Sequence, residues 1–186
     1  MEKHMVDKID EIILITGASG SGKSYICRKM KQMGKNVIDA DKLIARHFRL
    51  DTKDFVSKEE AKEITKRDPG IITWKWDQNA LKAALINFPE RPVYIFGSEE
   101  DTRRFFTMFD RVYILFVPDD DALRQRLSSR NPNKYYDGSH LLDRIVRFNN
   151  INMSCGDYEP NVVLVNSLRS EHEIVADILD TKIRPR

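Results

Sequence analysis

One eight-residue stretch of the sequence has the residue types and spacing needed to bind a phosphate. Residues 17–24 read GASGSGKS and fit the pattern G-x-x-x-x-G-K-[ST]. In such a loop, glycines let successive backbone N–H groups point at a phosphate, and the following helix adds the positive end of its dipole. Lys23 would then reach the β- and γ-phosphates of a nucleotide, and the Ser24 hydroxyl would ligate Mg²⁺. The predicted nucleotide-binding residues here are Gly17, Ser19, Gly20, Ser21, Gly22, Lys23 and Ser24.

Two acids, Asp39 and Asp41, follow the next short apolar run. In extended backbone a spacing of two residues puts both carboxylates on one side of the strand. At the carboxyl end of the second strand of a parallel sheet, both side chains can reach the space beside the phosphates. A second interpretation is that Asp41 caps a helix beginning near Lys42, because Asp is a favoured N-cap residue.

Arginines near the end of a later helical pattern form a second group that could bind phosphate. Arg126 and Arg130 are four residues apart, so a helix would present them on one face. The planar guanidinium group stacks on rings and pairs with phosphate oxygens. The alternative is that both arginines only complement the negative end of the helix dipole.

The elements that must position these residues are short apolar strands that alternate with helical patterns, as in parallel βαβ units. The strands are almost wholly apolar, which is typical of a sheet covered by helices on both faces. We expect an α/β fold with a doubly wound, five-stranded parallel sheet. The expected strands are Glu11–Thr16, Asn36–Ile38, Pro92–Phe96, Arg111–Val117 and Asn161–Val165. The expected helices are Gly22–Met33, Lys42–Phe48, Gln78–Asn87, Glu100–Phe109, Asp119–Ser129, Ser139–Asn150 and Ser170–Asp180.

Two further segments are expected to bind or enclose a second substrate. The segment from about residue 50 to about residue 90 lies between the second and third strands, where doubly wound enzymes carry inserts. We expect this segment to form a helical insert that binds the acceptor. Residues of about 130–138 are polar and are predicted to form a short lid. Ser57 with Glu60 and Ser170 with Glu173 predict capping boxes at two helix starts.

Length and composition predict one domain over residues 1–186. There are 31 Lys and Arg against 29 Asp and Glu, a balance that disfavours nucleic-acid binding. No apolar run approaches the roughly 18 residues of a membrane span, and no signal-peptide pattern begins the chain. Cys27 and Cys155 are expected to be buried thiols. A cytoplasmic location is therefore expected, and the oligomeric state is left open.

Together these motifs resemble those of the small P-loop kinases, which include nucleoside monophosphate kinases and shikimate kinase. The resemblance covers most of the chain and implies strand order 2-3-1-4-5, with ATP and Mg²⁺ as cofactors. By resemblance to the D-x-D motif of shikimate kinase, Asp39 would support the metal and Asp41 would face the acceptor hydroxyl. By resemblance to adenylate kinase, Arg126 would stack on adenine and Arg130 would meet the transferring phosphates. The same comparison implies that Arg144 points into the cleft and clamps phosphate.

The residues after the third strand also match this group in part. Gly97 and Ser98 look like the glycine-bearing turn that shikimate kinase uses near its acceptor, and Arg103 or Arg104 could hold an anionic group of that acceptor. Phe96 stands where adenylate kinases usually carry an acid. Magnesium support would therefore depend on Ser24 and Asp39.

These residues predict transfer of the γ-phosphoryl group of ATP to a small acceptor, whose identity stays open. Lid arginines and stacking on Trp74 or Trp76 would suit a nucleoside or nucleotide, whereas Asp41 and the Gly97-Ser98 turn would suit a hydroxyl metabolite. Residues 37–46, VIDADKLIAR, also resemble dephospho-coenzyme A kinase, which is a competing hypothesis. A nucleotide-dependent switch or slow ATPase and a 5′-hydroxyl polynucleotide kinase are also compatible with a phosphate loop.

Overall fold

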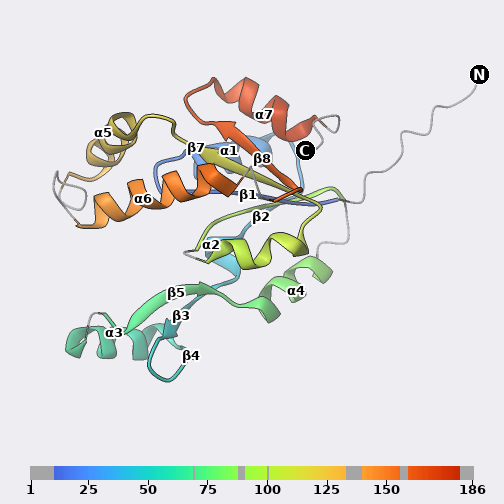
Figure 1. Cartoon of the computed structure of the whole chain (residues 1–186). Coiled ribbons are helices and arrows are strands. Elements are labelled where there is room, and N and C mark those ends of the chain that lie inside the picture. The colour runs from blue at the N-terminus through green and yellow to red at the C-terminus, as the bar shows by residue number, and fades with distance from the viewer. Residues whose placement is uncertain are drawn as a thin grey trace, which may run out of the picture.

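The main sheet of the protein consists of five parallel strands. The computed structural model describes residues 11–68, 70–87, 91–99, 101–132, 140–155 and 159–180. Strand order is β2-β6-β1-β7-β8, which is 2-3-1-4-5 when these five strands are counted along the chain. Figure 1 shows this sheet lying between helices in the main body of the molecule. The predicted parallel sheet and its order are thereby confirmed. The strands are β1 (Ile12–Gly17), β2 (Val37–Asp39), β6 (Val93–Phe96), β7 (Arg111–Phe116) and β8 (Val162–Asn166).

Helices cover both faces of this sheet, which explains why its strands are so apolar. Successive side chains of β1 alternate between the faces: Ile13 and Ile15 pack toward α1 and α7, and Leu14 packs toward the opposite side. The helices on the first face are α1 (Lys23–Gln32) and α7 (Glu171–Leu179). The elements on the second are α4 (Gln78–Asn87), the 3₁₀-helix η1 (Thr102–Met108) and α6 (His140–Ser154).

Helix caps fix the directions of the helices around the site. Asp119 caps α5 (Asp120–Arg130) by accepting hydrogen bonds from the backbone N–H groups of Asp121 and Ala122. Both predicted capping boxes are confirmed, at Ser57 with Glu60 and at Ser170 with Glu173. The apolar side of α5 packs on α6 in a small core of its own, so α5 carries its arginines toward the phosphate loop.

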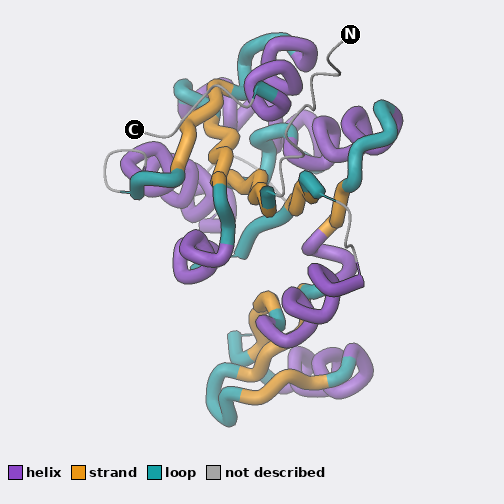
Figure 2. Tube along the Cα trace, turned by 90° about the vertical axis from the view of Figure 1, so that its right-hand side faces the viewer, coloured by secondary structure: helices purple, strands orange, loops and turns teal. Residues whose placement is uncertain are grey.

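The insert between β2 and β6 forms a lobe that projects from the main body (Figure 2). Its three antiparallel strands lie in the order β4-β3-β5. Along the chain the insert contains α2 (Ala40–Leu43), β3 (Ala45–Arg49), β4 (Asp54–Val56), α3 (Lys58–Arg67) and β5 (Ile72–Trp76), followed by α4. The prediction of a helical insert is therefore confirmed for α3 and α4, but it misses the three-stranded sheet.

The expected helix Lys42–Phe48 is wrong, because residues from Ala45 onward pair with two other strands. The ring of His47 lies 4.5 Å from the ring of Trp74 on β5, and the rings of Phe48 and Phe55 are 5.2 Å apart. Such cross-strand pairs stabilise a sheet and depend on partners that are distant in the sequence. Local periodicity could not reveal them.

Several smaller expectations can be compared directly with the structure. The helix expected at Glu100–Phe109 is the 3₁₀-helix η1. Residues 133–139, most of the expected lid, lie outside the described residues. Cys27 and Cys155 are buried free thiols, as predicted. No helix in the described part of the chain is long and apolar enough to cross a membrane.

Candidate functional site

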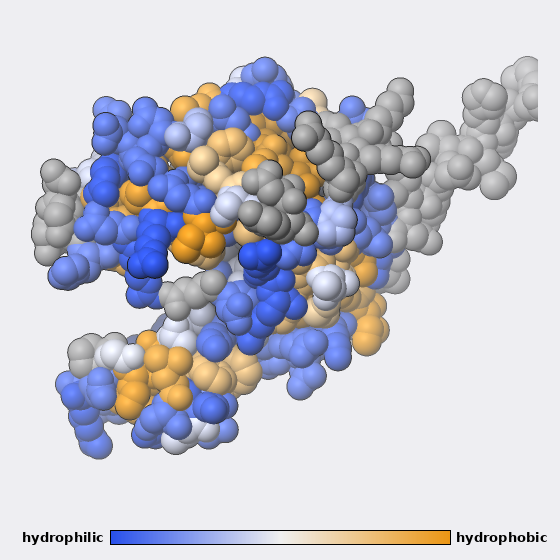
Figure 3. Space-filling model, viewed as in Figure 1, coloured by the Kyte–Doolittle hydropathy of each residue, from blue (hydrophilic) through white to orange (hydrophobic). Residues whose placement is uncertain are grey.

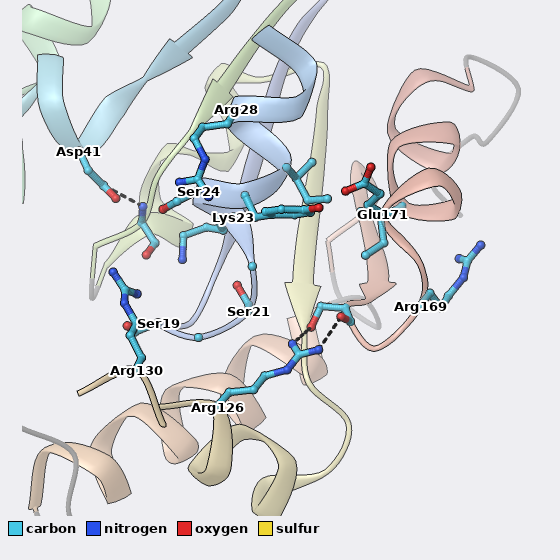
Figure 4. A pocket seen from close by; sticks show the side chains of 17 residues that line it. Ser19, Ser21, Lys23, Ser24, Arg28, Asp41, Arg126, Arg130, Arg169 and Glu171 are labelled. Carbon is cyan, nitrogen blue, oxygen red and sulfur yellow. Dashed lines mark hydrogen bonds between the residues drawn. The ribbon is translucent and has the colours of Figure 1, made fainter. Parts of the chain in front are cut away.

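A cavity of about 740 Å³ opens above residues 19–24, at the carboxyl ends of the sheet strands (Figure 4). Segments that are far apart in the sequence build its wall. Of the predicted site residues, those lining it are Ser19, Gly20, Ser21, Gly22, Lys23, Ser24, Asp41, Ser98, Arg126 and Arg130. Most of the predicted residues are thus brought to one place.

The predicted phosphate loop links β1 to α1, as the motif requires. Gly17 begins the loop with a φ of +144°, and a Cβ there would lie 2.2 Å from the carbonyl oxygen of Leu115. Only glycine fits between the loop and β7. The Gly22 position faces open space, with no atom within 4 Å of a Cβ built there. The loop backbone is therefore packed against the sheet at Gly17, and it is accessible from the cavity at Gly22.

Lys23 lies over this loop. Its ammonium group donates hydrogen bonds to the carbonyl oxygens of Gly17, at 2.7 Å, and Ala18, at 2.9 Å. Burial lowers the pKa of Lys23 to about 8; the Asp41 carboxylate opposes this change, and the positive charge of Arg130 adds to it. The charges of Asp41 and Arg130 thus both act on Lys23.

Asp41 lies in the first turn of the short helix α2, and its carboxylate reaches the turn after β6. Asp41 Oδ1 accepts a hydrogen bond of 3.2 Å from the backbone N–H of Ser98 (Figure 4). The interpretation of Asp41 as a helix cap is therefore wrong, since the cap position is Asp39. Burial raises the pKa of Asp41, and Lys23, the Ser98 N–H and the Trp76 indole oppose that rise. A carboxylate with a raised pKa is suited to accept a proton.

Asp39, the expected metal-side acid, forms an ion pair with Lys42, whose Nζ lies 3.0 Å from Asp39 Oδ2. It is not among the residues that line the described cavity. Lys42 is largely exposed, so this pair costs little to separate. The structure thus places Asp39 next to the site, with its carboxylate held by a neighbour on α2.

The two arginines of α5 occupy different places on the cavity wall. The guanidinium group of Arg126 donates to the backbone oxygen of Ser167, at 3.1 Å, and to the Ser167 hydroxyl, at 3.3 Å. Arg126 thereby ties α5 to the loop between β8 and α7. Arg130, one turn further along, extends toward Ser19 of the phosphate loop (Figure 4).

Two of the other expected residues lie away from the cavity. Arg103 forms an ion pair with Glu159 at 2.8 Å, and its side chain is about half exposed. Arg144 is exposed on α6 and is absent from the described lining of the cavity. Gly97 lies beside Asp41: a Cβ at Gly97 would be 2.7 Å from Asp41 Oδ1 and 2.9 Å from the ring of Trp76. The space beside Gly97 is thus filled by protein atoms.

The cavity also has lining residues that the sequence analysis missed, among them Arg28, Arg169 and Glu171. Arg28 lies four residues after Ser24 on α1, and this helical spacing could have revealed it. Glu171 pairs with Lys29 at 2.8 Å, and Arg169 pairs with Asp177. The first of these ion pairs joins α1 to α7, and the second joins the loop before α7 to the last turn of that helix. No sequence pattern pointed to either pair.

The site has groups that fit ATP with Mg²⁺. The buried hydroxyl of Ser21 has no hydrogen-bond partner among the described residues, and the loop below the cavity is open to a ligand. Mg²⁺ is typically held by one or two protein oxygens together with substrate phosphates and waters. The Ser24 hydroxyl could supply such an oxygen. Within the described ranges, no group of three or more His, Cys, Asp and Glu side chains could hold a metal by itself.

No known family model matches the chain. Two curated relatives are both named dephospho-CoA kinase. One, from Wolbachia sp. subsp. Brugia malayi (strain TRS), is 29% identical, with 66% of this chain and 75% of the relative covered. The other, from Dehalococcoides mccartyi (strain ATCC BAA-2266 / KCTC 15142 / 195), is 52% identical over 33 residues, which are 18% of this chain and 17% of the relative.

Solved structures with a similar fold span almost the whole chain. A gluconokinase from Sinorhizobium meliloti 1021 has a TM-score of 0.54 at 16% identity, covering 92% of this chain and 91% of its own. A sugar kinase from Janibacter sp. HTCC2649 has the same TM-score at 14% identity, covering 91% and 92%. At such identities the likeness concerns the fold.

Proposed function

We propose that this chain, a protein of the P-loop kinase type, transfers the γ-phosphoryl group of ATP to a hydroxyl group of a small acceptor. The acceptor would bind in the hollow between the main body and the insert, which is visible in Figure 3. ATP would bind along the cavity, with its phosphates on the loop that carries Lys23.

The observation that carries the hydroxyl assignment is the Asp41 carboxylate at the cavity wall, in reach of the charge of Lys23. A carboxylate can accept the proton that a hydroxyl loses on attack. It would instead repel the phosphate of a nucleotide acceptor, for which cationic partners are needed. Asp41 therefore favours a hydroxyl acceptor over a nucleoside monophosphate.

The proposed reaction is an in-line transfer in which the protein positions groups and neutralises charge. The acceptor oxygen forms a bond to the γ-phosphorus, and the bond from that phosphorus to the β,γ-bridging oxygen breaks. The acceptor proton goes to Asp41. Lys23 and Arg130 would face the negative charge that spreads over the phosphoryl oxygens. Magnesium bound near Ser24 would neutralise part of the same charge.

Dephospho-CoA is the first acceptor to test, because two curated relatives carry the name dephospho-CoA kinase. The match of residues 37–46 includes Asp41, the residue proposed to face the acceptor. Gluconate is the second, because a solved gluconokinase has a similar fold over most of the chain. We expect the insert, which includes the small sheet, to determine which acceptor binds.

The experiment is to measure ADP formation from Mg²⁺·ATP with a panel of acceptors. The panel contains dephospho-CoA, gluconate and other sugar acids, shikimate, nucleosides, nucleoside monophosphates and a 5′-hydroxyl oligonucleotide. We expect one hydroxyl compound to stimulate ADP formation and to appear as its phosphorylated product. Slow ADP formation that is indifferent to every acceptor would support a switch or slow ATPase instead.

Asp41→Asn tests the role of Asp41 directly. It keeps the shape of the side chain and its acceptor oxygen for the Ser98 N–H, but it removes the proton acceptor. We expect kcat to fall by about 100-fold or more, as for loss of a general base, while ATP affinity stays within a few-fold. Asp54→Asn is the control for loss of an acidic charge: Asp54 is exposed on β4 of the same insert and does not line the described cavity. A change in ATP affinity alone in Asp41→Asn would assign Asp41 to the nucleotide and contradict the proposal.

A further inference from the structure

Three consecutive residues after β6 hold Asp41 and the insert together. Gly97 leaves room for the Asp41 carboxylate and the Trp76 ring, Ser98 donates its backbone N–H to Asp41, and Glu99 binds the insert. The turn is thus a common support for the proposed proton acceptor and for strand β5, which belongs to the insert.

Glu99 is an unusual residue for such a turn, because its carboxylate is buried. Only 1% of its side chain is exposed. The partly exposed Arg104 forms an ion pair with it, in which Arg104 Nη2 lies 2.8 Å from Glu99 Oε1. The other Glu99 oxygen accepts a hydrogen bond from the backbone N–H of Trp76, 23 residues earlier in the chain. A buried charge costs free energy unless it is paired in this way. Glu99 therefore fastens the end of β5 to the turn beside Asp41.

Trp76 lies between this attachment and Asp41. Its side chain is 1% exposed and packs on Phe105, with ring centres 5.5 Å apart. A Cβ at Gly97 would lie 2.9 Å from Trp76 Cζ2, a ring atom two bonds from the indole nitrogen, and 2.7 Å from Asp41 Oδ1. The buried indole N–H has no partner at hydrogen-bond geometry among the described residues. It nonetheless lies near enough to Asp41 to oppose the rise in the pKa of that carboxyl.

We propose that Trp76 is a positioning residue whose indole N–H completes a hydrogen bond to Asp41 when the cleft closes over its ligands, with Glu99 holding Trp76 in place for this contact. The inference rests on the proposed role of Asp41. An unpaired buried N–H costs free energy that a hydrogen bond to the carboxylate would remove. Closure of the cleft over bound Mg²⁺ and ATP would thereby orient the group that takes the acceptor proton.

Trp76→Phe tests this contact, because it removes the indole N–H and keeps an aromatic ring. We expect kcat to fall by about 10- to 100-fold, as for a lost hydrogen bond to a charged group, with the KM for ATP unchanged. Tyr94→Phe is the matched control: it also removes a polar group from a buried aromatic side chain, but Tyr94 packs on the opposite face of the main sheet, away from Asp41. Tyr94→Phe should leave kcat and the KM for ATP unchanged.

A double-mutant cycle separates positioning from general damage to the fold. In an Asp41→Asn background, Trp76→Phe should cost no further activity, because the proton acceptor that the indole positions is already absent. Glu99→Gln is a second variant and should lower kcat in the same direction without weakening ATP binding. An equal loss from Trp76→Phe in both backgrounds, or no loss in a folded Trp76→Phe protein, would overturn the inference.

Fluorescence gives a readout that needs no acceptor. The chain has two tryptophans, so Trp74→Phe leaves Trp76 as the sole emitter. Addition of Mg²⁺ and a non-hydrolysable ATP analogue should shift its emission, and Asp41→Ala, which leaves no acceptor for the indole N–H, should abolish the shift. An unchanged emission overturns the inference. A wild-type protein that no acceptor stimulates contradicts the proposed function, whatever the emission does, so the two failures are distinguishable.

Discussion

At the scale of single residues, the site depends on charges that the fold holds partly out of water. Lys23 donates to two carbonyl oxygens of its own loop, and burial lowers its pKa to about 8. Asp41 is an opposite charge across the cavity, and burial raises its pKa. Each of the two groups therefore favours the charged form of the other. A phosphate on the loop would replace the carbonyl oxygens as the partner of Lys23.

Lys23→Ala should reduce acceptor-dependent ADP formation by at least about 100-fold, since it removes a cation aimed at the transferred phosphates. The fold should persist, because Lys23 contributes no side chain to the apolar core. ADP formation and thermal unfolding measure the two effects. Lys29→Ala, on the same helix and paired with Glu171, is the control and should keep turnover. Undiminished turnover in Lys23→Ala would contradict the assignment of the phosphate site.

At the scale of elements, caps and turns determine where the site residues lie. The capping box at Ser170 starts α7, and this helix begins beside the cavity at Glu171. The turn after β6, in contrast, has no capping motif of its own. It contains no regular element and is held by hydrogen bonds with Asp41, Trp76 and Thr102. The capping box joins residues three positions apart, whereas two of the residues that hold the turn, Asp41 and Trp76, lie more than 20 positions away in the sequence.

Ser170→Ala should lower the free energy of unfolding by about 1 kcal/mol, the usual cost of losing an N-cap side chain. The Ser170 hydroxyl accepts from the backbone N–H of Glu173, and alanine leaves that N–H unpaired. Urea unfolding measures the change. Ser170→Thr keeps a hydroxyl and should lose much less. Equal stability of Ser170→Ala and the wild type would show that water satisfies the helix end fully.

Gly97→Ala should reduce both stability and kcat more than a glycine-to-alanine change at an uncrowded position. The new methyl group would lie 2.7 Å from Asp41 Oδ1 and 2.9 Å from Trp76, closer than atoms can pack. We expect both a loss of stability above about 1 kcal/mol and a fall in kcat, because Asp41 must move. Gly34→Ala is the control: Gly34 has a φ of +71° but nothing within 4 Å, so only backbone strain applies. Equal effects of the two variants on kcat would contradict this account.

At the scale of the whole molecule, the insert and the main sheet share one apolar core. Trp76 and Ala45 of the insert, with Leu81 of α4, belong to the same buried cluster as Leu14 and Ile95 of the sheet. A projecting lobe that shares its core with the main body should not unfold separately.

Urea unfolding should therefore be a single cooperative transition. Tryptophan emission reports on the insert and its junction, because both tryptophans lie on β5, and far-ultraviolet circular dichroism reports on the helices of the main body. The two signals should have the same midpoint. A tryptophan transition at clearly lower urea would mean that the lobe unfolds independently.

The phosphate loop, the five strands of the sheet and the caps of α3 and α7 could all be predicted from the amino-acid sequence. These features depend on apolar runs, helix periodicity and residue spacing within a few positions, so they can be recognised without the fold. That Asp41 and Ser98 would lie close together was predictable as well, because each follows a parallel strand and the carboxyl ends of parallel strands meet at one edge of the sheet. Arg130, at the end of α5, was expected near them only from the resemblance to adenylate kinase.

The small sheet of the insert, the pairing of Arg103 with Glu159 and the contact of Arg126 with Ser167 became visible only in the folded chain. Each joins residues far apart in the chain, and hydrogen bonding across such distances leaves no periodic pattern. The role of Gly97 belongs to the same class. Its missing side chain is needed because Asp41 and Trp76 approach it from other elements, and that crowding exists only once the chain has folded.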